Sequence, residues 1–401
     1  MALMPVDEAL ERLLDGAARL PAETVPLGDA AWRVLAGPLA ALRTQPPFDA
    51  SAMDGYAVRS TDVATVPARL AVIGEAPAGR RFDGTVGPGQ AVRIFTGAPL
   101  PEGADTILIQ ENARVLEAGL IEAVETVASG RHIRRRGLDF KEGAALLDDG
   151  RMLDPAALSL AASANHASLS VVRRPLVAIL ATGDELLPPG SEPGPDQIIA
   201  SNGFGIAALV DRAGGAALDL GIAPDDRGAI DAAIRRALDA GADIIVTIGG
   251  ASVGDHDLVR EVLTRAGMEL DFWKIAMRPG KPLMFGRLGA VRVLGLPGNP
   301  VASLVCAHLF LAPLICRLAG RPHGLDLRDA VLGEAMAAND QRQDYVRAVA
   351  DDSTGRMVAT PFALQDSSML MTMAAANALI VRAPFAAQAA SGAPCQVIML
   401  R

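Results

Sequence analysis

The sequence of 401 residues contains few aromatic residues, few cysteines and few histidines. Aromatics make up 3% of it and hydrophobic residues 50%, so we expect its cores to consist of alanine, valine, leucine and isoleucine. The cysteines, Cys306, Cys316 and Cys395, form no CxxC pair, and reduced thiols in a cytoplasmic protein are the simplest interpretation. The five histidines have no HxxxH or similar spacing, which argues against a zinc site.

Positive charge is also scarce. Lys and Arg number 37 against 46 Asp and Glu, and the net charge of -9 argues against a general nucleic-acid binder. The first twenty residues are acidic and amphipathic, unlike a signal peptide. The apolar run 301–318 raises the question of a membrane span, but it contains His308, Pro313 and Arg317, so a buried core helix is favoured.

The pattern of elements predicts a multidomain protein of the α/β plus β class. A helix over 7–20 and a second one after Asp154-Pro155 suggest a discontinuous N-terminal and linker domain, 1–42 with 145–173. Short β-like runs separated by turns make 43–144 an inserted, mostly β domain. Short strands return in 323–401, which predicts a small C-terminal β-barrel.

Strands alternate with helices over 174–322, so this region predicts a doubly wound α/β domain with a parallel or mixed sheet. The expected strands are 176–181, 216–222 and 243–248, and the expected helices are 202–213, 226–240 and 256–266.

Two glycine-rich loops and an Arg-Pro-Gly-Lys-Pro turn at 278–282 follow strands of the α/β region. Ligands of open α/β sheets bind outside the carboxyl ends of the strands, where free backbone N–H groups favour anions. The turn is not a Walker loop, because Pro282 follows Gly280-Lys281, and no GxGxxG is present there. The residue chemistry therefore predicts an anionic ligand together with a divalent metal.

The same loops carry a family resemblance. GGASVGDHD at 249–257, FWKIAMRPGKP at 272–282 and GLPGNP at 295–300 resemble the molybdopterin-binding domain of the MoeA family, the molybdopterin molybdenumtransferases, which is related to the E domain of gephyrin. Further segments agree in order, namely FDASAMDGYAV at 48–58, RIFTGAPLP at 93–101, RRRGLDF at 134–140 and ATGDELLPPG at 181–190. The resemblance spans almost the whole chain and implies the same domain organisation.

The resemblance implies four site residues in the inserted domain, and each has a structural alternative. Asp54 and Thr96 lie in sequences typical of ordinary turns, where Asp bonds its own backbone. Arg134 belongs to a run of three arginines that a solvated surface would also explain, although guanidinium groups suit phosphates and oxyanions. Asp139 completes the set as the acid that follows this run.

Acidic residues of the α/β region form a second set. Either Asp184 or Glu185 caps a turn, and the resemblance selects Glu185 for the site. One acid of Asp225-Asp226 is expected to cap a helix, and the resemblance selects Asp225 for the cleft. Asp255 and Asp257 present a similar choice, and the resemblance selects Asp257. The predicted catalytic residues are thus Asp54, Thr96, Asp139, Glu185, Asp225 and Asp257, and the predicted Mg²⁺ ligands are Glu185, Asp225 and Asp257.

A third set is expected to bind the substrates. Lys274 has an alternative as an edge-strand lysine whose head reaches solvent, and Ser367 is uncertain by one residue against Ser368. Arg278 stands where several family members have Lys, so its charge is kept but its hydrogen-bond geometry differs. The predicted binding residues are Arg134, Gly249, Gly250, Ser252, Gly254, Lys274, Arg278, Lys281, Pro282, Pro297, Pro300, Arg347 and Ser367.

The resemblance implies that the protein inserts molybdate into adenylylated molybdopterin, with Mg²⁺-dependent release of AMP, in molybdenum cofactor biosynthesis. It also implies a cytoplasmic homodimer whose cleft lies between the α/β domain of one subunit and other domains of its partner. The adenylyltransferase that supplies the substrate is a compatible partner, whereas nucleic acid and membrane are not expected. Two alternatives remain open: adenylylation of molybdopterin, because a MogA-type domain resembles 174–320, and a non-catalytic scaffold like the gephyrin E domain.

Overall fold

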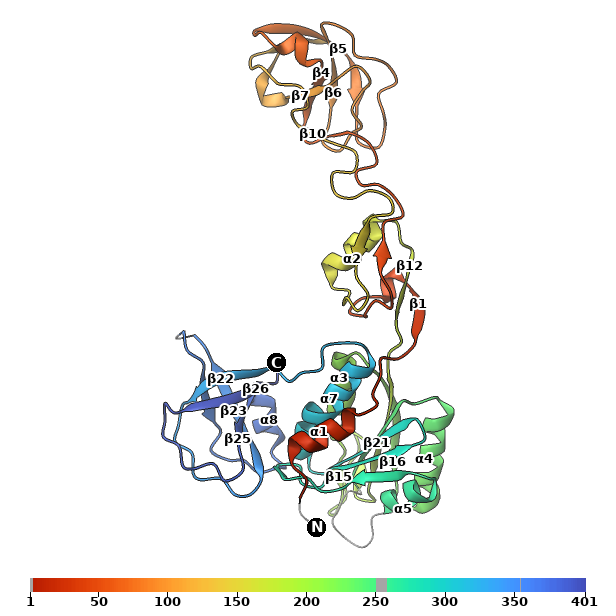
Figure 1. Cartoon of the computed structure of the whole chain (residues 1–401), viewed down its shortest axis with the longest axis vertical. Coiled ribbons are helices and arrows are strands. Elements are labelled where there is room, and N and C mark those ends of the chain that lie inside the picture. Colours follow the sequence, from red (N-terminus) through yellow and green to blue (C-terminus); the bar gives the residue numbers. More distant parts are fainter. Residues whose placement is uncertain (1–2, 250–257, 354) are drawn as a thin grey trace. The chain divides into compact units, whose positions relative to one another are not determined.

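The computed structural model describes residues 3–249, 258–353 and 355–401, and its chain divides into two compact units (Figure 1). One unit consists of Thr24–Ala31 and Gly37–Ser170, and the other of Met1–Glu23, Trp32–Ala36 and Val171–Arg401. The chain passes between them near β1 (Ala22–Pro26) and β12 (Ser168–Val172). The α/β plus β fold class is confirmed, while the finer division into four domains stays a prediction.

A six-stranded mixed sheet forms the centre of the larger unit. Its strand order is β16-β13-β17-β21-β20-β18, parallel from β16 to β21 and antiparallel beyond. These strands are β13 (Leu176–Thr182), β16 (Ala216–Ala223), β17 (Ile244–Ile248), β18 (Glu269–Phe272), β20 (Met284–Leu288) and β21 (Val291–Leu296). The three predicted strands match β13, β16 and β17 with end points that differ by no more than one residue.

Helices cover both faces of this sheet, as the alternating pattern predicts. Figure 1 shows α4 and α5 on one side and α1, α3 and α7 on the other, and each side has its own buried core. The helices are α1 (Val6–Leu14), α3 (Asn202–Ala213), α4 (Arg227–Asp239), α5 (Leu258–Arg265) and α7 (Ala312–Leu318). Val6, Ala9 and Leu13 of α1 are buried in the α/β core, whereas α2 (Pro155–Ser163) belongs to the other unit.

The longest apolar helix is a core helix. It runs over Pro300–Leu318 as α6 (Pro300–Cys306), a π-helical turn and α7. Within the described residues it is the helix long and apolar enough to cross a membrane, with a mean hydropathy of 1.9, yet 72% of that window is buried inside the protein. The interpretation of 301–318 as a buried helix is therefore confirmed.

The predicted C-terminal barrel is also present. Its strands pair in the order β23-β24-β22-β26-β25, and a further pairing of β25 with β23 closes the ring. The barrel strands are β22 (Leu327–Leu332), β23 (Gln343–Asp351), β24 (Val358–Pro361), β25 (Ala378–Arg382) and β26 (Pro394–Met399). Tyr345, Leu379 and Ile398 of these strands belong to the same core as the α/β helices, so barrel and sheet stabilise each other.

The smaller unit is mostly β, as predicted. Its six-stranded sheet has the order β7-β4-β6-β5-β9-β8. These strands are β4 (Gly55–Val58), β5 (Ala68–Ala76), β6 (Gln90–Ile94), β7 (Thr106–Ile109), β8 (Ala113–Glu117) and β9 (Leu120–Ala123), joined by the short pairings β3 (Ala50–Ser51) with β10 (Ile133–Arg134) and β2 (Leu39–Ala40) with β11 (Ala145–Leu147). Helix α2 begins with Pro155 behind Asp154, whose carboxylate accepts from the Ala157 N–H at 2.9 Å.

Candidate active site

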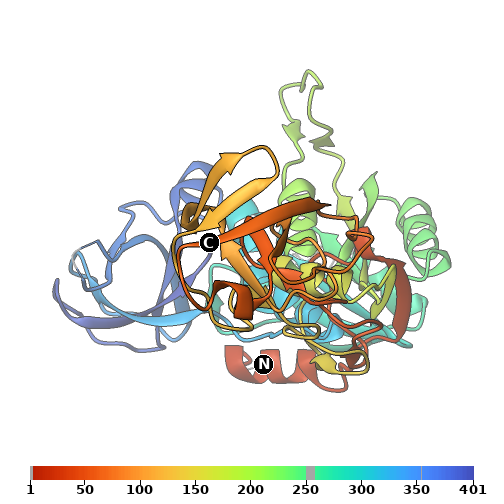
Figure 2. The same cartoon turned by 90° about the horizontal axis from the view of Figure 1, so that it is seen from above.

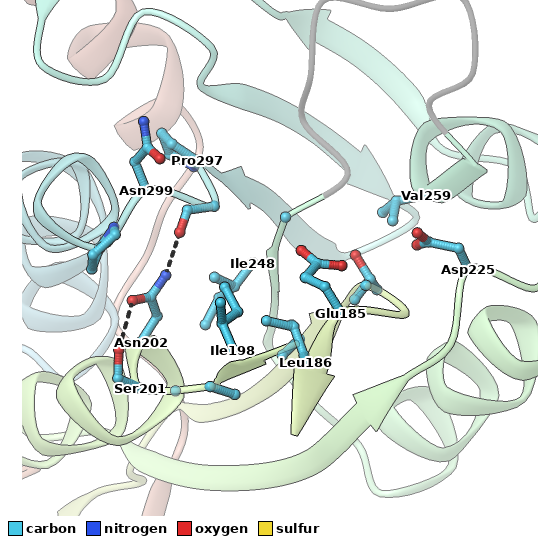
Figure 3. Close-up of a pocket in the computed structure, with 18 of the residues that line it drawn as sticks. Glu185, Leu186, Ile198, Ser201, Asn202, Asp225, Ile248, Val259, Pro297 and Asn299 are labelled. Carbon is cyan, nitrogen blue, oxygen red and sulfur yellow. Dashed lines mark hydrogen bonds between the residues drawn. The ribbon is translucent and has the colours of Figure 1, made fainter. Parts of the chain in front are cut away.

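A cavity of about 1100 Å³ opens at the carboxyl ends of the parallel strands (Figure 3). Thr182 and Glu185 reach it from the end of β13, Gly249 from the end of β17, and Pro297 to Pro300 from the end of β21. Gly249 has φ +91°, and a Cβ atom there would lie 2.7 Å from the Thr182 carbonyl oxygen, so only glycine lets β17 end this close to β13. This is the edge at which α/β sheets bind their ligands.

One end of the cavity is acidic. Figure 3 shows Glu185 and Asp225 on the same side of it. Burial raises the pKa of Asp225 above its ordinary value, and the nearby charges of Asp184 and Glu185 raise it further. The Asp184 carboxylate accepts from the Asp225 N–H at 3.0 Å, and Asp226 caps α4 by accepting from Ala229 N at 2.9 Å. Asp184 and Asp226 thus hold the backbone, while Glu185 and Asp225 face the cavity.

The opposite end contains amides and apolar side chains. The Asn202 side chain donates to the Gly298 carbonyl at 2.7 Å, which holds the turn after β21 against α3. Ile198 and Ile199 line the mouth from an arm formed by β14 (Leu186–Leu187) and β15 (Ile198–Ile199), which Figure 2 shows as a yellow-green extension. The sequence interpretation missed these residues, and the exposed Ile-Ile pair after a Pro- and Gly-rich loop was the signal available.

Of the predicted cations, Lys274 lies over Trp273 and Lys281 lies in the turn that follows. The Lys274 ammonium sits 4.4 Å from the centre of the Trp273 ring, and the Arg260 guanidinium lies 4.2 Å from the same ring. Lys281 is exposed, and its carbonyl accepts from the Ile275 N–H at 3.1 Å, which closes the turn. Pro282, the next residue, lines the cavity.

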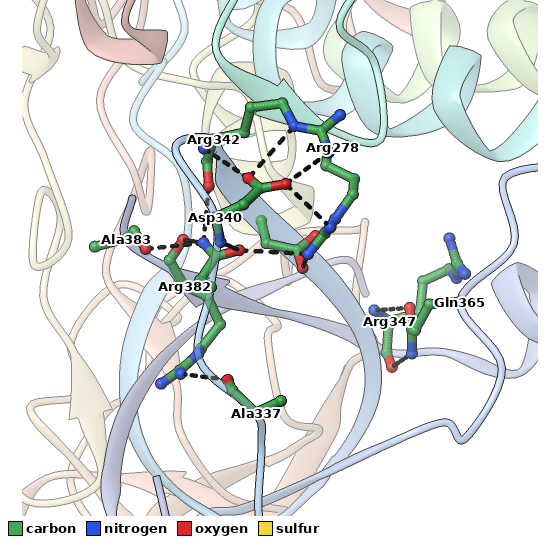
Figure 4. A network of polar contacts seen from close by, with 10 residues as sticks. Arg278, Ala337, Asp340, Arg342, Arg347, Gln365, Arg382 and Ala383 are labelled. Carbon is green, nitrogen blue, oxygen red and sulfur yellow. Dashed lines mark hydrogen bonds and ion pairs between the residues drawn. The ribbon is translucent and has the colours of Figure 1, made fainter. Parts of the chain in front are cut away.

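Arg347 is the largest fully buried side chain among the described residues. Its backbone exchanges two 3.0 Å hydrogen bonds with the Gln365 amide, but none of its three guanidinium nitrogens has a partner in the described part of the chain (Figure 4). Burial lowers the pKa of Arg347, and the charges of Asp344 and Asp366 oppose that shift. A buried guanidinium without hydrogen-bond acceptors is unfavourable, so this position favours an incoming anion.

The two serines in question have different surroundings. Ser367 accepts a hydrogen bond from the Asn299 side chain at 3.0 Å, and its carbonyl accepts from Val301 N at 3.0 Å. Ser368 lines the cavity and donates to Asp366 at 2.6 Å. Ser367 therefore fixes the start of α6, whereas Ser368 is the one of these two serines that lines the cavity.

In the smaller unit, the structure brings Asp54 and Thr96 together. The Asp54 carboxylate accepts from the Thr96 N–H at 2.7 Å and from its hydroxyl at 2.8 Å. These bonds, and the charge of Arg93, hold the pKa of Asp54 below its ordinary value. Arg134 is exposed on β10, opposite Ala50 of β3.

The arginine run and the acid after it have separate partners. Arg135, the neighbour of Arg134, pairs with Asp49 at 2.7 Å. The Asp139 N–H donates to the Gln45 carbonyl at 3.1 Å. The run therefore supports the loop before β3 as well as presenting Arg134 to solvent.

The predicted metal ligands are only partly described. Of the three ligands, Asp257 lies outside the described residues, as do the predicted binding residues Gly250, Ser252 and Gly254. Within those described, no group of three or more His, Cys, Asp or Glu side chains is close enough to hold a metal ion. The carboxylates of Glu185 and Asp225 are nevertheless of the hard oxygen type that Mg²⁺ prefers, and their mutual repulsion is what a cation would relieve.

Comparison with known proteins matches the whole chain. Three family models match it: the MoeA N-terminal region (domain I and II) over residues 4–165, a probable molybdopterin binding domain over 178–317, and the MoeA C-terminal region (domain IV) over 329–400. The chain is 34% identical over 389 residues to the molybdopterin molybdenumtransferase of Haemophilus influenzae, with 94% of both chains covered. It is 35% identical over 407 residues to that of Bacillus subtilis, with 99% of this chain and 94% of the other covered.

Solved structures agree over the same length. Two structures of the molybdopterin biosynthesis MoeA protein of Pyrococcus horikoshii give TM-scores of 0.81 and 0.78 at 28% and 26% identity. They cover 100% and 99% of this chain, and each is itself covered over 100% of its length. The chain therefore belongs to the MoeA family of molybdopterin molybdenumtransferases.

Proposed function

We propose that this molybdopterin molybdenumtransferase of molybdenum cofactor biosynthesis uses the adenylylated form of molybdopterin, inserts molybdate into its dithiolene and releases AMP. The observation that carries the proposal is the 1100 Å³ cavity, which lies in the region matched by the molybdopterin-binding model. Ligand pockets of proteins typically hold about 300–1,000 Å³, so this one has room for a pterin joined to a nucleotide. The match over all three regions favours this function over an adenylyltransferase or a scaffold.

The acidic end is proposed to hold Mg²⁺ beside the phosphoanhydride. Glu185 and Asp225 are its ligands in this proposal, together with Asp257, which lies outside the described residues. The bound cation supplies positive charge that offsets the anhydride oxygens. Before it binds, burial raises the pKa of Asp225, and the charges of Asp184 and Glu185 raise it further.

The cationic residues are proposed to bind the oxyanion. Molybdate and a phosphoanhydride repel each other, so their approach requires fixed positive charge. Arg347 supports this role because it is buried and its nitrogens have no described partner. Lys281 and Lys274 add positive charge nearby in sequence, and Arg278, which donates to Asp344, is proposed to act through the turn that carries Lys281. In this proposal Arg347 and the two lysines bind and orient the oxyanion, and Ser368 adds a hydroxyl.

Asp54, Thr96, Arg134 and Asp139 are proposed as further site residues. The lowered pKa of Asp54 keeps it ionised at neutral pH, so it acts as an acceptor and not as a proton donor. Thr96 orients that carboxylate through two hydrogen bonds. We also propose that the protein is cytoplasmic, works as a homodimer and receives its substrate from an adenylyltransferase.

The test is an assay of AMP release by the full-length protein with adenylylated molybdopterin, Mg²⁺ and molybdate. We expect release that depends on molybdate and that falls about 100-fold in Asp225→Asn, comparable to the roughly 10²–10³ that loss of one preorganised group of an oxyanion hole costs in kcat. Asp211→Asn is the matched control, because Asp211 is an exposed acid of the same unit that pairs with Arg174 away from the cavity. ATP consumption with molybdopterin instead would indicate an adenylyltransferase, and no turnover of either substrate would indicate a scaffold.

A further inference from the structure

Arg278 is already engaged by acidic residues of the barrel (Figure 4). Its strand, β19 (Met277–Arg278), pairs in parallel with β23, and the register sets Arg278 opposite Asp344. Its guanidinium donates to the Asp344 carboxylate, lies 3.5 Å from an Asp340 oxygen and 3.3 Å from the Asn339 amide oxygen. This pairing was not predictable from the sequence, because Asp344 is 66 residues further along the chain.

The loop that supplies these acceptors is itself fixed. Arg342 donates to Asp340 from its backbone and from its side chain, both at 2.8 Å, and these bonds lower the pKa of Asp340 to about 2. The Asn339 amide donates to the carbonyls of Arg342, Arg382 and Ala383 at 2.7 to 3.1 Å. Two arginines, 278 and 342, thus face two aspartates, 340 and 344, so the cluster is close to neutral.

Asp344 also acts on Arg347. Both residues lie on β23, and the charge of Asp344 is the larger of the two that oppose the lowering of the Arg347 pKa. The Asp344 side chain is only 16% exposed, so its charge is weakly screened by water. Removing that charge therefore weakens both the hold on Arg278 and the compensation of Arg347.

The backbone pairing between β19 and β23 is short. It comprises two residue pairs, Met277 with Gln343 and Arg278 with Asp344, and a 2.8 Å bond from Gln343 N to the Ala276 carbonyl. Lys281 follows three residues after Arg278, and Arg347 three residues after Asp344. Whatever holds Arg278 against Asp344 therefore sets how the turn with Lys281 lies relative to the strand with Arg347.

We propose that Asp344 is a positioning residue for the cations that bind the oxyanion: it holds Arg278 and so fixes Lys281 relative to Arg347. The inference rests on the proposed function and deepens it. In this proposal Arg278 does not bind the oxyanion, because an oxyanion that used its N–H groups would have to displace the Asp344 carboxylate. Charge-assisted hydrogen bonds of this kind are among the stronger ones in proteins.

The test compares molybdate KM and kcat in wild type and Asp344→Asn. Loss of one charged hydrogen bond of about 1.5 kcal/mol or more corresponds to roughly tenfold, so KM for molybdate is expected to rise about tenfold with little change in kcat. Asp326→Asn is the matched control, since Asp326 is another barrel acid paired with an arginine, Arg328, at 2.8 Å. The exchange Arg278→Asp with Asp344→Arg is expected to restore most of the lost affinity.

A fall in KM for molybdate in Asp344→Asn would contradict the proposal. If Arg278 binds the oxyanion directly, releasing it in Asp344→Asn lowers KM, and an unchanged KM equally contradicts the proposal. Amide hydrogen exchange gives a second readout that needs no substrate: Asp344→Asn is expected to speed exchange in 276–282, and Asp344→Glu to speed it less. Unchanged exchange there counts against this role of Asp344 even if the protein proves inactive, whereas wild type without molybdate-dependent AMP release counts against the proposed function alone.

Discussion

Replacing Arg347 by Met is expected to stabilise the protein when no oxyanion is bound. The guanidinium is fully buried and lacks hydrogen-bond partners among the described residues. Exchange of buried charges for apolar side chains of similar size is often stabilising by about 1–4 kcal/mol. Since about 1 kcal/mol shifts Tm by roughly 2–4 °C in a domain of 150–250 residues, the Tm of the variant should be several degrees higher than that of wild type.

Molybdate is expected to offset this difference. A ligand at 100 times its Kd stabilises the state that binds it by about 2.7 kcal/mol, so molybdate at that concentration should raise the Tm of wild type. Arg347→Met should gain little, because the buried charge that favours the anion is gone. Calorimetry with and without molybdate measures both differences.

Arg292, near the start of β21, is a partly buried arginine whose Nε lacks a described partner and which donates to the Asp15 carbonyl at 3.1 Å. Arg292→Met should leave the response to molybdate intact. If Arg347→Met is less stable than wild type without ligand and still responds fully to molybdate, Arg347 is a structural residue and the reasoning is wrong.

Three further predictions concern the acids. Thr96→Val removes a hydrogen bond that lowers the pKa of Asp54, so NMR titration should show that pKa rise toward its ordinary value. A carboxyl group whose pKa is lower in the folded state than in the unfolded state stabilises the folded state at pH values above its unfolded-state pKa. This stabilisation is lost as the pH falls through the folded-state pKa. Because the variant has less of it, the variant should unfold at a higher pH than wild type during acidification. Asp226→Ala removes the cap of α4 and should reduce the free energy of unfolding by about 1 kcal/mol in urea, with Mg²⁺ affinity unchanged; no loss would contradict the cap. Asp184→Asn should lower the raised pKa of Asp225, so that Mg²⁺ binding measured by calorimetry persists to lower pH than in wild type. An identical pH profile would show that Asp225 is not a ligand.

The α/β elements could be predicted because their signals are local. Five consecutive buried residues make β17, and the acid pair before α4 supplies both a cap and a cavity residue. The sequence could not decide which acid caps, because both stand next to the helix start. The structure decides it: Asp226 has the extended backbone of a cap, and its carboxylate reaches Ala229 N.

Contacts between distant segments account for what the sequence did not reveal. Asn202 bonds to Gly298, 96 residues away, and Arg278 pairs with Asp344, so neither partner could be found from spacing. The core shared by α1, the α/β helices and the barrel is likewise invisible in a pattern of apolar residues, which shows that a face is buried but not against what.

Three of the predicted cations, Lys274, Arg278 and Arg347, differ in how far their charge is already compensated. Lys274 lies over the face of an indole ring, and Arg278 faces carboxylates, so each has a favourable neighbour before any ligand binds. Arg347 has only the more distant charges of Asp344 and Asp366 and has no described hydrogen-bond acceptor. An anion gains most where compensation is least, because no existing bond must be broken to bind it. Discrimination between a doubly charged oxyanion and neutral solutes should therefore depend on Arg347 more strongly than on Arg278 or Lys274.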